Sequence, residues 1–114
     1  MQKKEIAILL HNIRSTHNVG SIFRTADALS VTKIYLSGYT PTPLDRFGKA
    51  RKDVAKVSLG AEKTIDWEYI ENPQQIIKKL KKEEFQIIAL EQSTSSVDYK
   101  KVNIKKTSFV CGRE

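Results

Sequence analysis

Residues 5–26 read EIAILLHNIRSTHNVGSIFRTA, and their hydrophobic pattern changes midway from that of a strand to that of a helix. Glu5–Leu10 is a compact apolar run, which is typical of a buried strand. Apolar residues then recur at helical spacing: Val19, Ile22, Phe23, Ala26 and Leu29. Asn18 stands directly before them, and asparagine is a favoured N-cap residue. The stretch therefore predicts a strand followed by a helix that Asn18 caps.

The residues that follow continue the alternation of strands and helices. Val31–Ser37 is rich in β-branched and aromatic residues, so it predicts a second strand. Tyr39–Leu44 contains two of the three prolines and predicts a loop. Ala50–Leu59 predicts a short helix.

The C-terminal half begins with a clear helix start. Asn72 is placed to cap a helix whose first residue is Pro73, a favoured position for proline. Two apolar runs, Gln86–Glu91 and Ser108–Cys111, predict further strands, and Gln92–Asp98 between them predicts a polar loop. Strands separated by helices predict a single α/β domain over residues 1–114, with a parallel sheet covered by helices on both faces.

Length and composition limit the class of protein. The 114 residues suit one domain. The longest apolar runs, Ile6–Leu10 and Ile87–Leu90, are far shorter than the ~20 residues of a membrane-spanning helix, so no membrane partner is expected. The apolar stretch behind the basic N-terminus is too short for a signal peptide. A single cysteine, Cys111, excludes an internal disulfide framework and a cysteine-based zinc cluster. These features predict a cytoplasmic protein without a metal.

The positive charge is concentrated in the N-terminal half. Of the net charge of +7, residues 1–57 carry +6 and residues 58–114 carry +1. Within residues 46–56, only Asp53 offsets five basic residues: Arg46, Lys49, Arg51, Lys52 and Lys56. Such a local excess attracts polyanions through counterion release, and RNA or DNA is the commonest partner of this kind. The alternative is a solvated surface that keeps the protein in solution.

Polar side chains crowd between the first strand and the first helix. In open α/β sheets, ligands bind at this edge, and helix N-termini offer free N–H groups to anions. Arg24 projects about 160° from the apolar stripe and ~9 Å along the axis from Asn18. Its guanidinium could therefore share a surface with Asn18 and Arg14, or it could be an ordinary exposed arginine beside a capped helix. Gly20, inside the helix, indicates that a backbone or a ligand comes close.

The order Asn-x-Arg-x3-Asn-x-Gly-x3-Arg-Thr-Ala over residues 12–26 resembles motif 1 of the SpoU/TrmH family of RNA 2′-O-ribose methyltransferases, in the SPOUT superfamily. Seven of these fifteen positions match the motif. The end of the chain, FVCGRE at residues 109–114, resembles the start of motif 2, an apolar strand followed by Gly-x-Glu. The resemblance covers essentially the whole chain.

This resemblance implies an α/β fold with a deep C-terminal trefoil knot that holds S-adenosylmethionine, and a homodimer with the active site at its interface. Arg24 matches the catalytic arginine of the family and Asn18 the asparagine beside it. Glu114 matches the acidic residue of motif 2 and completes the predicted catalytic set. Leu90 and Gly112 match positions whose backbone contacts the cofactor.

The implied function is S-adenosylmethionine-dependent methylation of a ribose 2′-OH in tRNA or rRNA. Asn12 and Arg14 match polar positions of the family that meet the RNA. The basic segment adds three further predicted RNA-binding residues: Arg46, Arg51 and Lys52. Two roles for the matching arginine stay open, removal of the hydroxyl proton, or phosphate binding with stabilisation of the developing alkoxide.

The chain departs from the family at its end. Family members continue beyond the position of Glu114 into motif 3, which completes the knot and the cofactor pocket. We therefore expect an incomplete knot within these residues, which would be the first part of a longer methyltransferase. Two alternatives stay open: a non-catalytic basic RNA-binding module, and an unrelated α/β scaffold in which the motif is a coincidence.

Overall fold

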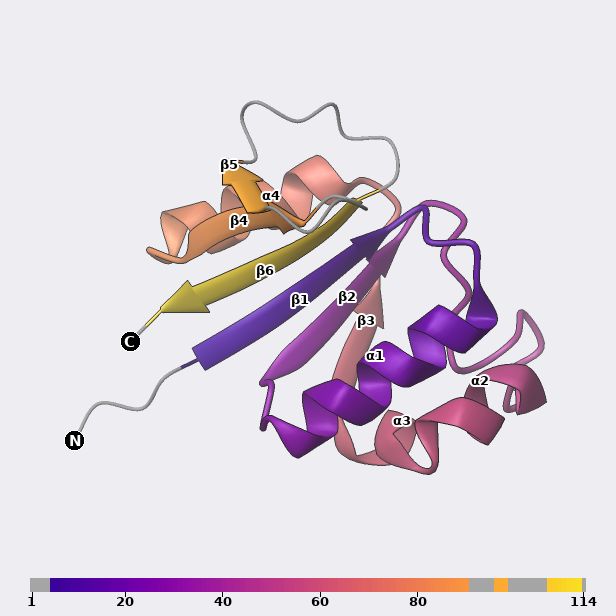
Figure 1. Cartoon of the computed structure of the whole chain (residues 1–114). Helices are drawn as coiled ribbons and strands as arrows, with labels where there is room; N and C mark the ends of the chain where they lie inside the picture. The colour runs from indigo at the N-terminus through magenta and orange to yellow at the C-terminus, as the bar shows by residue number, and fades with distance from the viewer. Residues whose placement is uncertain (1–4, 91–95, 99–106, 114) are drawn as a thin grey trace.

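The structure, a computed structural model, describes residues 5–90, 96–98 and 107–113. In this part of the chain the strands form one six-stranded sheet of order β3-β2-β1-β6-β4-β5 (Figure 1). The elements, in chain order, are β1 (Glu5–His11), α1 (Thr16–Ala28), β2 (Lys33–Ser37), α2 (Lys52–Ser58), α3 (Ala61–Thr64), β3 (Asp66–Tyr69), α4 (Pro73–Lys82), β4 (Gln86–Leu90), β5 (Ser96–Asp98) and β6 (Thr107–Arg113).

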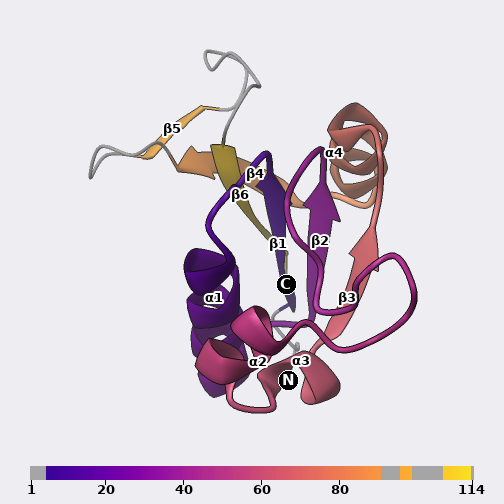
Figure 2. The same cartoon turned by 90° about the vertical axis from the view of Figure 1, so that its right-hand side faces the viewer.

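The central strands are buried on both faces. Successive side chains of β1 alternate between two hydrophobic cores, because neighbouring residues of a strand point to opposite faces. Leu9 packs with Ile77 and Leu80 of α4, whereas Leu10 packs with Phe23 of α1. Helices α1, α2 and α3 therefore lie on one side of the sheet and α4 on the other (Figure 2). This arrangement confirms the predicted α/β fold with helices on both faces.

The direction of the strands agrees with the prediction in the N-terminal half and differs near the C-terminus. Strands β1, β2 and β3 are parallel. In contrast, β6 runs antiparallel to both of its neighbours, β1 and β4, and β5 pairs antiparallel with β4 where we expected a loop. The sheet is therefore mixed and not wholly parallel. The prediction was wrong on this point because an apolar run indicates burial but carries no information about strand direction. The predicted knot stays a prediction.

The first helix begins earlier than predicted. Ser15, and not Asn18, is the N-cap of α1, and its Oγ accepts a hydrogen bond from the backbone N–H of Asn18 at 3.1 Å. Serine and asparagine cap helices about equally well, which explains the error. At the other end, the helix stops at Ala28. Leu29, which was predicted to belong to the buried apolar stripe, therefore lies beyond the helix and is 67% exposed.

Other elements confirm the sequence pattern or escape it. Helix α2 lies within the expected range, and α4 begins at Pro73 with the Asn72 carboxamide oxygen accepting from the N–H of Gln74 at 3.0 Å. Neither α3 nor β3 was predicted. Both are only four residues long, and β3 is an edge strand whose residues are exposed except for the half-buried Trp67.

Gly20 lies where α1 and α2 meet. A Cβ added to Gly20 would lie 2.8 Å from the backbone oxygen of Val54 and 2.8 Å from the Cβ of Val57. The close approach that the glycine predicted is therefore made by another helix. This contact places the start of α2 beside α1 on the same face of the sheet (Figure 2).

Candidate functional site

The segments that leave β1 and β2 are joined by side-chain hydrogen bonds. Nδ1 of His11 lies 2.9 Å from the hydroxyl of Ser37, at the paired ends of the two strands. The hydroxyl of Thr40 donates to the carbonyl of Leu10 at 3.1 Å and accepts from the N–H of Ile13 at 3.0 Å. Burial lowers the pKa of the His11 imidazole below its ordinary range. These contacts hold the two loops side by side at the carboxyl edge of the parallel strands.

Asn12 fixes the loop that follows β2. Its carboxamide oxygen accepts a hydrogen bond from the backbone N–H of Tyr39 at 3.1 Å. The backbone N–H of Asn12 donates to the carbonyl of Ser37 at 3.2 Å. Gly38, with a φ of +65°, leaves room for this contact, because a Cβ there would lie 1.8 Å from the Asn12 oxygen. Asn12, predicted to bind RNA, is therefore half-buried and joins the two loops.

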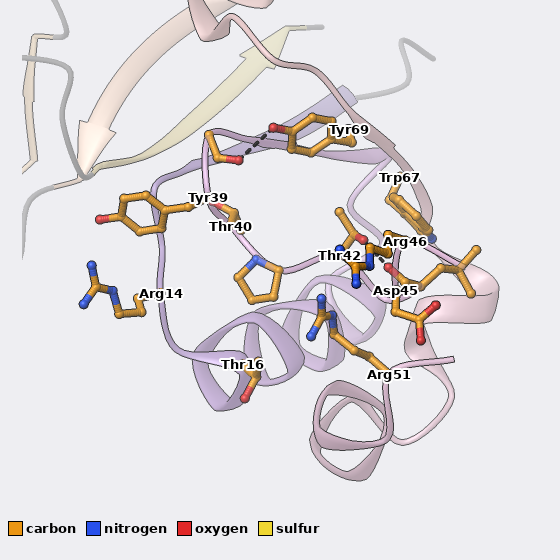
Figure 3. A pocket seen from close by; sticks show the side chains of 13 residues that line it. Arg14, Thr16, Tyr39, Thr40, Thr42, Asp45, Arg46, Arg51, Trp67 and Tyr69 are labelled. Atoms are coloured by element: carbon orange, nitrogen blue, oxygen red, sulfur yellow. Dashed lines mark hydrogen bonds between the residues drawn. The ribbon is translucent and has the colours of Figure 1, made fainter. Parts of the chain in front are cut away.

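Beyond these loops lies an open groove of about 660 Å³ (Figure 3). It is formed by the loop before α1, the long loop between β2 and α2, and β3. Its lining combines three arginines with three aromatic residues: Arg14, Arg46, Arg51, Tyr39, Trp67 and Tyr69. Asp45 is the one carboxylate among the lining residues. The groove is therefore both basic and aromatic.

The arginines have different surroundings. The guanidinium carbon of Arg14 lies 5.3 Å from the centre of the Tyr39 ring, and that of Arg46 lies 4.9 Å from the centre of the Phe47 ring. Both distances are in the range of cation–π contacts. Arg51 is the N-cap residue of α2, and its Nε is buried without a hydrogen-bond partner among the described residues. Such a buried donor is costly to leave unpaired.

The carboxylate of Asp45 is used inside its own loop. It accepts hydrogen bonds from the N–H groups of Phe47 at 2.8 Å and Lys49 at 3.0 Å. A bridge between Leu44 and Ala50 closes the same loop. The negative charge therefore stabilises a tight turn, and the side chains at its tip, Arg46 and Phe47, are exposed.

The two predicted catalytic residues of motif 1 lie on α1. Both Asn18 and Arg24 are exposed, and the step of six residues from one to the other corresponds to ~9 Å along a helix axis. Arg24 makes no hydrogen bond or ion pair with the described part of the chain. Arg14, which was expected to share a surface with them, lines the groove, whereas Asn18 and Arg24 do not.

The predicted cofactor residues are not brought together. Leu90 ends β4 and pairs with Ser108, whereas Gly112 pairs with Gln86 at the opposite end of the same pair of strands. Four residues of extended strand separate the two levels, or ~13 Å. Glu114 lies outside the described residues. The contact of Leu90 and Gly112 with S-adenosylmethionine therefore stays a prediction.

The basic residues of the groove were predicted from the sequence, but its aromatic residues were not. Arg14, Arg46 and Arg51 all line it, while Lys52 is exposed in the first turn of α2 and lies outside the lining. Tyr39 and Tyr69 were not predicted to belong to the site. In the structure the Tyr69 hydroxyl donates a hydrogen bond to the Gly38 carbonyl at 2.7 Å, next to Tyr39. Across the described residues, no group of three or more metal-binding side chains is present, and no helix is long and apolar enough to cross a membrane.

Comparisons with known proteins agree on one family. The family model described as the SpoU rRNA Methylase family matches residues 5–114. The chain is 32% identical to a tRNA (guanosine(18)-2′-O)-methyltransferase of Aquifex aeolicus (strain VF5), over 99% of this chain and 51% of that protein. It is 26% identical to the 23S rRNA (guanosine-2′-O-)-methyltransferase RlmB of Neisseria meningitidis serogroup B (strain ATCC BAA-335 / MC58), over 100% of this chain and 43% of that protein.

A solved structure supports the same grouping. The crystal structure of the A. aeolicus TrmH/SpoU tRNA modifying enzyme superposes with a TM-score of 0.57 at 27% sequence identity. The match covers 75% of this chain and 39% of that chain. This chain therefore spans about half the length of the curated relatives that it matches.

Proposed function

The chain belongs to the SpoU rRNA methylase family, and on this basis we propose that it methylates a ribose 2′-OH of tRNA or rRNA. The relatives that it matches are named as 2′-O-methyltransferases of tRNA and of 23S rRNA. The observation that carries the proposal is the motif 1 sequence from Asn12 to Arg24, of which Arg14 lines a basic and aromatic groove while Asn18 and Arg24 are exposed on α1. Family membership also makes S-adenosylmethionine the proposed methyl donor.

The groove suits RNA by its charge. Arg14, Arg46 and Arg51 line it, and the one carboxylate among the described residues of the lining, that of Asp45, accepts hydrogen bonds from two N–H groups of its own loop. Arginine binds phosphate oxygens with two parallel hydrogen bonds, which gives both affinity and orientation.

We propose that Arg24 acts on the RNA side of the reaction. Methylation of a 2′-OH requires the hydroxyl to lose its proton while negative charge develops on the oxygen. A guanidinium keeps its proton in proteins, so it suits stabilisation of that charge and binding of the adjacent phosphate better than removal of the proton. Arg24 is exposed and unpaired among the described residues, and Asn18 lies on the same helix.

We propose that the protein acts as a homodimer, as the family resemblance implies, with residues of both copies at the active site. We also propose a cytoplasmic location, which rests on the composition of the sequence. Asn18 and Arg24 are exposed on α1, and Arg24 makes no hydrogen bond or ion pair with the described residues, which is compatible with a site completed by a second copy.

One observation favours a second candidate function. The basic and aromatic groove is lined by Arg14, Arg46 and Arg51 but by neither Asn18 nor Arg24, which supports a non-catalytic RNA-binding module. Such a module would bind RNA through the groove, with an affinity that falls steeply with salt and does not respond to S-adenosylmethionine.

A methyl-transfer assay distinguishes the two candidates. The full-length protein is incubated with RNA and S-adenosylmethionine labelled in its methyl group, and label in the RNA is counted. We expect transfer by the wild type, and at least a hundredfold loss for Arg24→Ala, as for removal of one group that stabilises an oxyanion. Lys78→Ala is the matched control, because Lys78 is an exposed cation on α4, across the sheet. RNA binding without transfer would favour the binding module.

A further inference from the structure

Two arginine–aromatic pairs border the same groove. Arg14 lies over Tyr39, and Arg46 lies over Phe47, at 5.3 and 4.9 Å from the respective ring centres. Arg14, Tyr39 and Arg46 all line the groove, and Phe47 follows directly at the tip of the loop that carries Arg46. Figure 3 shows Arg14 close to Tyr39 at one end of the groove, and Arg46 toward the other.

The two rings are exposed to an unusual degree. Phe47 is 74% exposed and Tyr39 is 51% exposed. Large aromatic side chains gain much of their stabilising effect from burial, and these two differ from other exposed apolar residues because each has an arginine over its ring near one groove. Neither ring takes part in the two hydrophobic cores of the described chain.

Both rings are carried on braced backbone. The N–H of Tyr39 is held by the Asn12 carboxamide, and the N–H of Phe47 by the Asp45 carboxylate. The Tyr69 hydroxyl adds a hydrogen bond to the Gly38 carbonyl, next to Tyr39. Because the loops are ordered before any ligand arrives, little conformational entropy is lost on binding.

The ligand must combine negative charge with flat apolar faces. A base-paired helix covers the faces of its bases, whereas an unpaired segment offers them for stacking on aromatic side chains and on guanidinium planes. A second copy of this chain could occupy the groove only by placing an acidic surface there, because the described lining carries three arginines and one carboxylate.

We propose that Tyr39 and Phe47 are stacking surfaces for unpaired bases, so that the groove binds a single-stranded segment of the RNA. The arginine beside each ring contacts the neighbouring phosphate or extends the stacking surface. This inference rests on the proposed function, which makes RNA the substrate, and adds the conformation in which that RNA is bound.

The test compares two forms of one RNA. The affinity of the full-length protein is measured by fluorescence anisotropy for a short labelled RNA without secondary structure, and for the same strand annealed to its complement. We expect Tyr39→Ala and Phe47→Ala each to weaken binding of the single strand about tenfold and to change binding of the duplex less than about twofold. Phe47→Trp should retain the affinity, whereas Phe47→Leu, which keeps an apolar side chain without a ring, should lose it.

Leu29→Ala is the matched control, since it removes an apolar side chain that is 67% exposed at the end of α1, away from the groove lining. Thermal unfolding of each variant confirms that it is folded. Equal effects on single strand and duplex, no effect on either, or a change of oligomeric state in Phe47→Ala would overturn the stacking role and leave the proposed function intact. Failure of the wild type to bind either RNA would instead overturn the proposed function.

Discussion

The carboxamide oxygen of Asn12 lies 3.1 Å from the backbone nitrogen of Tyr39, and this hydrogen bond joins the loop after β1 to the loop after β2. Asn12 belongs to the motif that marks the family, and Tyr39 lines the groove. The contact therefore couples the predicted catalytic segment to the proposed RNA site, with Gly38 as the residue that permits it.

Substitution of Gly38 tests this coupling. Gly38→Ala places a Cβ within 1.8 Å of the Asn12 oxygen at a φ of +65°, so the hydrogen bond to Tyr39 breaks. Gly48→Ala is the control, because Gly48 has a φ of +79° with nothing within 4 Å of an added Cβ. We expect Gly38→Ala to lower the free energy of unfolding in urea by about 1–3 kcal/mol more than Gly48→Ala. Equal losses would show that the Asn12 contact contributes no stability.

Gly20 holds α1 against α2. In Gly20→Ala the new methyl group would meet the Val54 backbone oxygen at 2.8 Å, and the backbone yields less easily than a side chain. We expect the variant to lose about 1–3 kcal/mol of stability in denaturant unfolding. Ser21→Ala, at an exposed position of the same helix, should be neutral or slightly stabilising. A Gly20→Ala protein as stable as the wild type would contradict the close packing.

The arginines of the groove should control the salt dependence of RNA binding. We expect Arg46→Gln and Arg51→Gln each to lower the slope of log affinity against log salt concentration by about one, since each loses one phosphate contact. The measurement is a salt titration of RNA affinity, with Lys78→Gln on α4 as the control. Unchanged slopes for both arginine variants would place the RNA elsewhere.

His11 makes the stability of the protein depend on pH. Burial lowers its pKa, so between the folded and unfolded pKa values the unfolded state binds more protons than the folded state. The free energy of unfolding should therefore rise with pH through this window and fall as the pH drops below about 6.5, the ordinary pKa of histidine. His11→Gln should flatten the profile between about pH 5 and 7 in urea titrations. A flat profile in the wild type would contradict the role of His11.

Much of the fold could be predicted because periodicity reports burial. The runs that became β1 and β2 are apolar on both faces, and Asn72 with Pro73 marked the start of α4. Strand direction could not be predicted for β6, since an apolar run reads the same whichever way it pairs. The cap of α1 was misplaced because Ser15 and Asn18 offer the same hydrogen-bond acceptor three residues apart.

Part of the site could be predicted because charges that cluster in the sequence also cluster in the structure. Arginines clustered in the sequence, such as Arg46 and Arg51, are visible as a basic segment. Tyr39 lies in the loop after β2, and Tyr69 is the last residue of β3. The parallel pairing of these two strands brings both tyrosines to the groove, so no local sequence pattern connects them. Phe47 could have been noticed in the sequence, because it is a large aromatic residue in a loop whose nearest neighbours, from Asp45 to Lys49, include no other apolar side chain.

The position of the transferred methyl group tests the central claim most directly. RNA labelled by the full-length protein from methyl-labelled S-adenosylmethionine is hydrolysed with alkali, which cleaves only next to a free 2′-OH. If the chain is part of a ribose 2′-O-methyltransferase, the label remains in an alkali-resistant dinucleotide, and Arg24→Ala produces none. Label released in mononucleotides, or no label in RNA that the protein demonstrably binds, would contradict the claim.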